Sequence, residues 1–239
     1  MVFVTLSRMA TRKTITFNDA AKPIRKPITK FGGQPVWLEV AQWPLSRELG
    51  VPMRFIGQIA IPPEQFPEGG GKVAYIFMTD TDDYVDGTWE PNGGENAVIV
   101  QPAEDADPPI VEVSADATGP TIQRYVKALF SKKLKPKDVE LSVELSDEYE
   151  PDFIPDDEKE PHTDKQLQEY WDAIQGNKIG GAPAFIQYDE YPDREGSWRL
   201  LLQLDSCAVP FHLNFGDAGI GHVFVDGPVT KARLLWQCS

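Results

Sequence analysis

The sequence KFGGQPVWL at residues 30–38 decides the expected fold, because it recurs as KIGGAPAFI at residues 178–186. Both copies have the same order of residue types: a basic residue, an apolar residue, Gly-Gly, any residue, Pro, any residue, an aromatic residue and an aliphatic residue. A Gly-Gly pair permits positive φ or close backbone approach, and the Pro two residues later favours an extended chain leading into the ring. We therefore expect two equivalent turns, each with a ring packed beneath it. The residues that shape them are Gly32, Gly33, Pro35 and Trp37 in the first copy and Gly180, Gly181 and Pro183 in the second.

Two further pairs of blocks match in the same order along the chain. MRFIGQIA at residues 53–60 matches WRLLLQLD at 198–205, which aligns Gln58 with Gln203, and YIFMTD at 75–80 matches HVFVD at 222–226. These short apolar blocks are typical of core strands, whose Gln side chains must hydrogen-bond nearby backbone if they are buried. The three blocks predict an α+β fold made of two related β-rich halves. We expect this internal duplication to carry a few short helices and to pack as one compact unit.

The blocks also set the expected domain boundaries. We place the first β-rich repeat at residues 30–137 and the second at 163–239, separated by an acidic linker or loop at 138–162. Residues 1–29 are expected to form a basic N-terminal arm. Within the repeats, helical spacing predicts helices over 121–130 and over 163–174, the second of which begins at a capping Thr.

The charge of the chain is large and unevenly distributed. The formal net charge is −14, and residues 1–30 carry seven basic residues against one acid, which leaves −20 for the remainder. A protein region with this large a negative charge repels the phosphate backbone of a nucleic acid and attracts a basic protein. We therefore expect a basic protein partner and no nucleic acid.

Cysteine content and hydropathy bear on the compartment. Cys207 and Cys238 are the only cysteines, as in proteins of a reducing compartment. The N-terminus lacks the apolar run of a signal peptide, and no stretch approaches membrane-spanning length. These features predict a cytoplasmic protein without a membrane partner, and nothing in the sequence points to a cofactor.

Several blocks resemble known families. FGGQPVWL (31–38), PMRFIGQI (52–59), LLQLD (201–205) and NFGDAGIGHVFV (214–225) resemble the YwqG-like family, a bacterial domain of unknown function. The resemblance implies an α+β fold with two related halves and no established activity. The opening block also resembles that of the programmed cell death 2 family, eukaryotic chaperone-like proteins whose cysteine-rich zinc sites are absent here. That weaker kinship implies a scaffold able to bind a basic protein client.

No stretch has the pattern of a catalytic or metal site. His212 and His222 flank Asp217, but their spacing matches no ligand signature. The glycines between them favour a tight turn at Gly216, Asp217 and Gly219, in which Asp217 bonds local backbone amides. As an alternative, a cryptic enzyme or small-ligand protein would use a cleft between the halves and bring Arg54, Arg199, His212 and Asp217 to one pocket.

Two acidic runs carry the leading functional hypothesis. Residues 79–107 hold nine acids and no Lys or Arg, and residues 138–160 hold eleven acids. Such runs serve as solvated surface, or they steer and hold a basic protein with interleaved aromatic anchors. We favour a non-enzymatic binding protein. The resemblance to the YwqG-like family implies, most specifically, an immunity protein that neutralises a basic antibacterial toxin, and the weaker kinship implies a chaperone-like binder of a basic client as the alternative. The expected partner-binding residues are Asp82, Asp83, Tyr84, Asp86, Trp89, Asp147, Glu148, Tyr149, Asp152 and Phe153.

Overall fold

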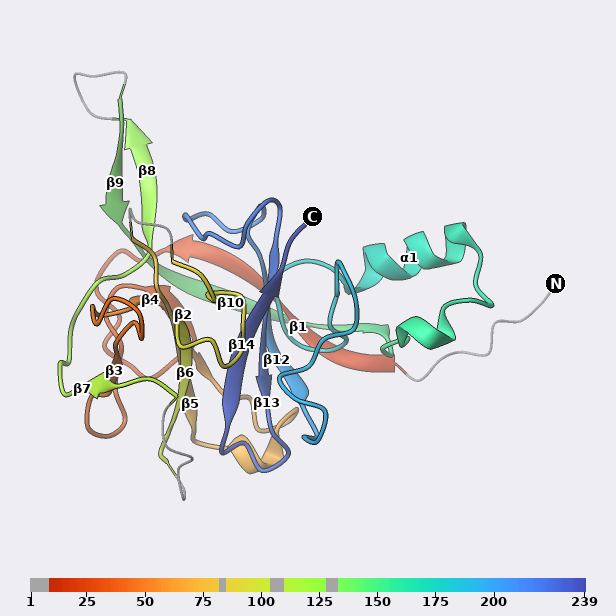
Figure 1. The fold of residues 1–239 in the computed structure, drawn as a ribbon, viewed down its shortest axis with the longest axis horizontal. Helices are drawn as coiled ribbons and strands as arrows, with labels where there is room; N and C mark the ends of the chain where they lie inside the picture. The colour runs from red at the N-terminus through yellow and green to blue at the C-terminus, as the bar shows by residue number, and fades with distance from the viewer. Residues whose placement is uncertain (1–8, 82–84, 104–109, 128–132) are drawn as a thin grey trace.

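A computed structural model describes residues 9–81, 85–103, 110–127 and 133–239 (Figure 1). Most regular structure in these residues is β-strand. The strands are β1 (Met9–Asp19), β2 (Lys30–Gly32), β3 (Trp43–Pro44), β4 (Arg54–Ala60), β5 (Val73–Met78), β6 (Asn96–Gln101), β7 (Val113–Ser114), β8 (Gln123–Lys127), β9 (Leu134–Asp138), β10 (Glu140–Pro151), β11 (Lys178–Gly180), β12 (Arg199–Asp205), β13 (Ile220–Val225) and β14 (Ala232–Gln237).

One antiparallel sheet of ten strands organises the molecule. Its order is β14-β13-β12-β11-β1-β10-β2-β4-β5-β6. The sheet curls until its edge strands β14 and β6 lie beside each other, so that it is nearly closed (Figure 1). Two ribbons, β3 with β7 and β8 with β9, stand apart from it.

The expected α+β fold with an internal duplication is therefore wrong. The described residues contain one α-helix, α1 (Asp164–Ile174), and two short 3-10 turns, η1 (Pro67–Gly69) and η2 (Asp156–Glu158). Instead of two repeats that each close on themselves, strands from both expected halves join one continuous sheet. None of the helices in the described segments is long and apolar enough to cross a membrane.

The segments expected to form the arm and the linker contribute the two central strands of the sheet. β1 and β10 pair along their whole length, from Met9 opposite Pro151 to Asp19 opposite Leu141. Opposite charges face each other across this pair, where Arg12 lies 2.8 Å from Glu148 and Lys13 lies 2.6 Å from Asp147. Cross-strand ion pairs of this kind favour one register. Arg12 and Lys13 of the basic stretch thus pair with acids of the acidic run.

The two predicted helices have different outcomes. The helix expected over 163–174 is confirmed as α1, which Thr163 caps together with Gln166 in a reciprocal capping box. The helix expected over 121–130 is wrong, since residues 123–127 form β8 and pair with β9. Its β-branched and aromatic residues, Tyr125 and Val126, favour a strand, and pairing across a hairpin overrides the weak helical spacing.

The two Gly-Gly turns are built as expected. Gly32, Gly33, Gly180 and Gly181 all have positive φ, between 63° and 79°. At Gly181 an added Cβ would lie 1.8 Å from Glu150 Oε1, so only glycine fits there.

The two buried glutamines hold these turns through backbone hydrogen bonds. Gln58 Oε1 accepts from the Val36 amide at 2.8 Å, and Gln203 Oε1 accepts from the Ala184 amide at 2.8 Å. Both side chains are fully buried, and both also donate to backbone carbonyls. The interpretation of these glutamines as structural residues is therefore confirmed.

Candidate partner-binding groove

A buried ion cluster fixes the second Gly-Gly turn to the centre of the sheet. Lys178 Nζ donates to both oxygens of Glu150, at 2.9 and 2.8 Å, and to the Ala182 carbonyl at 2.6 Å. Arg12 Nη1 approaches the same carboxylate to 2.9 Å. The Lys178 and Glu150 side chains are completely buried, and burial lowers the pKa of Lys178 to about 8. The turn is thereby held rigidly, together with the residues that follow it.

Aromatic rings cover the outside of this turn. Phe185 packs edge-on against Phe153 and Tyr191, with ring centroids 5.8 and 5.5 Å apart, and it stacks on Phe224. The buried His222 lies beside Phe185 and contacts the Ala184 carbonyl through Nε2 at 3.2 Å. Desolvation lowers the pKa of His222 to about 3, so the imidazole is neutral.

The loop at residues 187–198 adds acids to these rings. Its sequence, QYDEYPDREGSW, contains four acids and one Arg. Tyr188 is 54% exposed, and Tyr191, which packs on one side against Phe185 and Phe224, is still 36% exposed. The loop forms a cavity of about 600 Å³ lined by Tyr188, Asp189, Glu190, Tyr191, Asp193, Arg194, Gly196, Ser197 and Trp198.

Two further cavities border the segment that follows the second Gly-Gly turn. One of about 430 Å³ also has Tyr191 and Trp198 in its wall, together with Phe153 and Gly181. Another of about 330 Å³ shares Phe153 and lies against α1. We call the first two cavities, which meet at Tyr191 and Trp198, the acid–aromatic groove.

Hydrogen bonds hold the acids of the groove in place. Asp189 Oδ2 accepts from the Asp156 amide at 2.8 Å, and Glu190 Oε2 accepts from Gln237 at 3.1 Å. Asp193 Oδ1 accepts from the Gly196 amide at 2.6 Å. Two neighbouring N–H groups lower the pKa of Asp193 below its ordinary value, and the Trp198 indole has a larger effect than the Gly196 amide. This carboxylate therefore stays charged at neutral pH.

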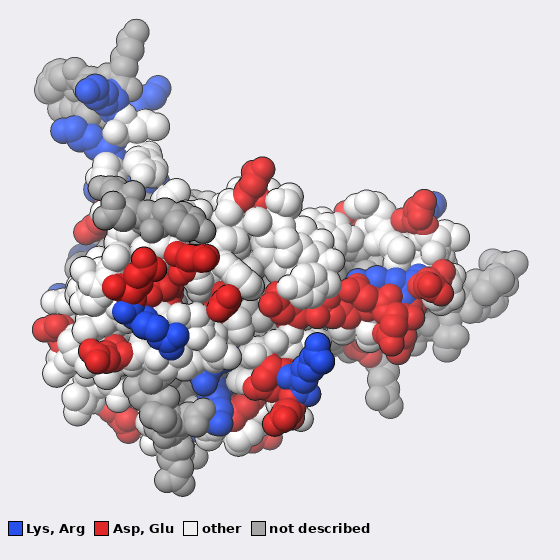
Figure 2. All heavy atoms as spheres, viewed as in Figure 1, with Lys and Arg blue, Asp and Glu red and all other residues white. Residues whose placement is uncertain are grey.

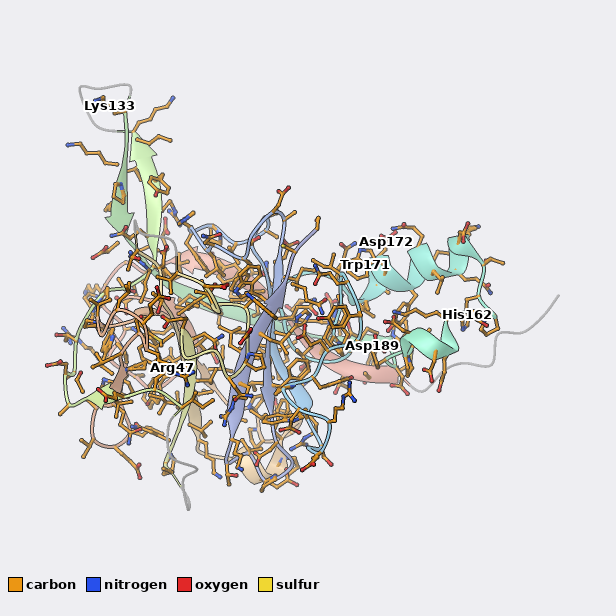
Figure 3. All side chains as sticks on the ribbon, viewed as in Figure 1. Arg47, Lys133, His162, Trp171, Asp172 and Asp189 are labelled. Atoms are coloured by element: carbon orange, nitrogen blue, oxygen red, sulfur yellow. The ribbon has the colours of Figure 1, made fainter. Side chains whose placement is uncertain are left out.

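The charge pattern of the surface agrees with this placement. Figure 2 shows Asp and Glu side chains gathered over the end of β1 and β10 beneath α1. In Figure 3, Asp189 lies at this end of the molecule, near Trp171 of the helix. A basic or cationic group approaching this end meets a negative potential, and it would find exposed rings to stack on.

The structure distributes the predicted partner-binding residues over several places. Asp147 and Glu148 are paired with Lys13 and Arg12, as described above, and Tyr149 is 72% exposed opposite Thr11, which lines the groove. Phe153 lies in the groove wall, directly after the half-buried Asp152. Asp86 and Trp89 line a different cavity, of about 340 Å³, beside Trp236. Asp82, Asp83 and Tyr84 lie outside the described residues.

The four residues expected to share a catalytic or ligand pocket do not converge. Arg54 binds Asp80 at 2.8 Å, whereas Arg199 binds Glu68 at 3.2 Å and lies over a ring in the groove. His212 contacts Tyr125 of β8, and Asp217 is exposed in the turn before β13. The expected turn is present, although it is the Asn214 side chain that accepts a local amide there. In the described part of the chain, no three His, Cys, Asp or Glu side chains are grouped to hold a metal ion.

The loop at residues 187–198 is not among the binding segments predicted from the sequence. The signal was present, since three rings and four acids occur within eleven residues from Tyr188 to Trp198. The same combination of acids with aromatic residues singled out the other two runs. This loop is shorter and includes Arg194, so its acid density is less conspicuous.

The family model described as "Domain of unknown function (DUF1963)" matches residues 29–233. No curated protein matches the chain.

Proposed function

Starting from the premise that the chain belongs to the DUF1963 family, whose function is unknown, we propose that it is a binding protein whose acid–aromatic groove takes a basic segment of a protein partner. The observation that carries the proposal is the cavity of about 600 Å³ in which Tyr188, Tyr191 and Trp198 stand among Asp189, Glu190 and Asp193. Tyr and Trp are the residues most often found as binding hot spots. We also propose the finer assignment to the YwqG-like family on the blocks quoted above.

The chemistry of the groove favours Arg and Lys with neighbouring apolar residues. Carboxylates pair with guanidinium and ammonium groups, and the faces of Tyr and Trp rings attract the same cations. The net charge of −14 accelerates the encounter with a basic protein. For the specific partner we propose a basic antibacterial toxin, which makes the chain an immunity protein. A basic chaperone client would use the same groove.

The binding test uses a fluorescein-labelled peptide of alternating Arg and Tyr residues, followed by fluorescence anisotropy. Removing two exposed loop charges with Asp193→Asn and Glu195→Gln is expected to weaken binding by about 2- to 30-fold, since exposed ion pairs contribute about 0.2–1 kcal/mol each. Replacing a ring with Tyr191→Ser is expected to cost about 30-fold.

The matched control removes two exposed acids outside the groove, through Asp116→Asn with Asp217→Asn. The proposal fails if this control weakens binding as much as the loop variant, because the charge effect would then be non-specific. The toxin assignment has its own test. A basic protein captured by the chain must arrest growth when expressed alone and lose this effect when the chain is coexpressed.

A further inference from the structure

The β8–β9 hairpin is a basic element on an acidic protein. Figure 1 shows it projecting from the body, and Figure 2 shows Lys and Arg gathered along it. Residues 123–138 contain six basic residues and one acid, and subtracting their +5 from −14 leaves −19 for the rest of the chain. Every residue of β9 is exposed. An isolated two-stranded hairpin is only marginally stable in water, so a partner that covers it would stabilise it.

The two faces of this hairpin differ in chemistry. Residues directly opposite each other in an antiparallel pair share a face. One face carries Tyr125 opposite Pro136 and Lys127 opposite Leu134, and the rings and aliphatic groups there are largely exposed, with Tyr125 at 52% and Leu134 at 57%. Lys135 and Lys137 lie on the other face. The hairpin therefore presents apolar groups and lysines together.

The base of the hairpin is fixed to the body. Arg124 lies 2.9 Å from Asp19 of β1 and donates to the Pro210 carbonyl at 2.7 Å. The His212 amide donates to the Gln123 carbonyl at 2.7 Å, and the Tyr125 ring packs edge-on against His212. The direction in which the strands project is therefore set by the fold.

The hairpin matches the groove chemically but is far from the groove of its own chain. In Figure 3, Lys133 lies at the upper left, at the far end of the hairpin, whereas Asp189 lies well apart from it, right of the centre of the molecule. We propose that the β8–β9 hairpin of one copy docks in the acid–aromatic groove of a second copy. This inference rests on the proposed function, because it identifies a second copy of the chain as one basic partner of that groove. Tyr125 and Leu134 would pack against the exposed rings, with Lys127 of the same face beside Asp193, while Lys135 and Lys137 on the other face would add to the attraction between the hairpin and the acidic loop.

The length of the hairpin makes such a contact compatible with two negative bodies. Five residue pairs span about 17 Å at about 3.4 Å per residue. The Debye length is about 8 Å at physiological salt, so the two bodies are largely screened from each other when only the hairpin enters the groove. Because hairpin and groove are different surfaces, the contact is heterologous and adds copies head to tail.

The test is the molar mass of the purified chain, measured by light scattering after size exclusion at about 0.15 M and about 0.5 M salt. We expect association at low salt that is lost at high salt. Lys135→Glu with Lys137→Glu should abolish it through the hairpin, and Asp193→Lys with Glu195→Lys should abolish it through the groove. The control variant, Lys22→Glu with Lys26→Glu, has the same change in net charge as the hairpin variant, but at exposed lysines outside the hairpin. It should still associate.

Mixing the hairpin variant with the groove variant provides the decisive result. Each variant keeps one functional surface, so the mixture should form a one-to-one complex and stop there. Circular dichroism checks that both variants are folded. A wild-type chain that stays monomeric at low salt overturns the inference, as does a mixture that stays monomeric.

The proposed function is judged separately by the peptide assay. If the labelled peptide binds the groove while the chain stays monomeric, the proposed function stands and the self-association is wrong. If a monomeric chain instead binds anionic lipid vesicles or duplex DNA through Lys135 and Lys137, the hairpin serves a different partner and the inference is likewise overturned.

Discussion

Replacing Lys178 with Met tests the central ion cluster. The substitution keeps the length of the side chain and removes its charge, which leaves Glu150 with Arg12 as its remaining cationic partner. Glu150 Oε1 also accepts from the Ala182 amide, so the carboxylate stays buried against the second Gly-Gly turn. An unpaired buried carboxylate is costly, because the interior replaces little of its lost hydration.

The structure allows the cost to be bounded. Removing one partner of a buried ion pair costs about 3–5 kcal/mol, and the retained Arg12 places Lys178→Met near the lower end, about 3 kcal/mol. For a chain of this size that corresponds to a fall in Tm of about 6–12 °C. Lys30 provides the matched comparison, since its side chain is equally buried but its partner Glu140 is 17% exposed. Water reaches that carboxylate, so Lys30→Met is expected to cost only about 1–2 kcal/mol.

Urea unfolding followed by tryptophan fluorescence measures both variants against the wild type. The expected order of stability is wild type, Lys30→Met, then Lys178→Met. Equal losses for the two variants would refute the argument, because the difference rests on the complete burial of Glu150. A loss below about 1 kcal/mol for Lys178→Met would also refute it, since that is the range of a surface pair.

Three further predictions concern single positions. Burial lowers the pKa of His222 to about 3, so as the pH falls below 6.5 the unfolded chain binds a proton that the folded chain does not, and stability falls. At pH 5 the loss of stability is about 2 kcal/mol. Urea unfolding at neutral and acid pH should show this loss in the wild type and in the exposed control His212→Gln but not in His222→Gln. An unchanged pH dependence in His222→Gln would contradict the assignment of the loss to His222. Gly181→Ala should destabilise the chain by more than about 2 kcal/mol in thermal unfolding and should also weaken peptide binding. Gly176 has positive φ but nothing within 4 Å of an added Cβ, so the control Gly176→Ala should cost about 1 kcal/mol and leave binding intact. Equal losses of stability would show that the cost comes from the positive φ and not from contact with Glu150. Thr163→Ala removes the cap of α1 and should cost about 1 kcal/mol, measured by urea unfolding, while Thr163→Ser should cost little; a full loss in the Ser variant would argue against the capping bond.

Features that depend on neighbouring residues could be predicted from the sequence. The positive φ at both Gly-Gly pairs follows from glycine chemistry, and the limits of α1 follow from a capping Thr and an apolar face. The core strands expected in the blocks at residues 53–60 and 198–205 correspond to β4 and β12. These signals are local, so no knowledge of the sheet was needed.

Features that depend on distant residues could not be predicted in the same way. β1 and β10 are separated by more than a hundred residues, and their pairing depends on a match between two charged patterns. Taken singly, each pattern is typical of solvated surface, which is why they were interpreted as an arm and a linker. The same limitation applies to the groove, because its walls come from residues 64–66, from the turn at 180–183 and from residues 187–198.

The two Gly-Gly turns indicate why binding is proposed at only one of them. At the first turn, Trp37 stacks on Phe77 and packs at a tilt against Tyr75, and its indole N–H donates to the Ala117 carbonyl. Gln34 exchanges two hydrogen bonds with Gly119, so the segment around residues 117–119 covers that turn.

At the second turn, the corresponding ring is Phe185, and a cavity remains along Gly180, Gly181 and Pro183. The loop that borders it supplies exposed rings and acids in place of a covering segment. The same type of Gly-Gly turn thus lies under a covered surface in the first case and beside an open groove in the second. Since leaving rings exposed gains nothing for stability, the open turn is where a partner is expected to bind.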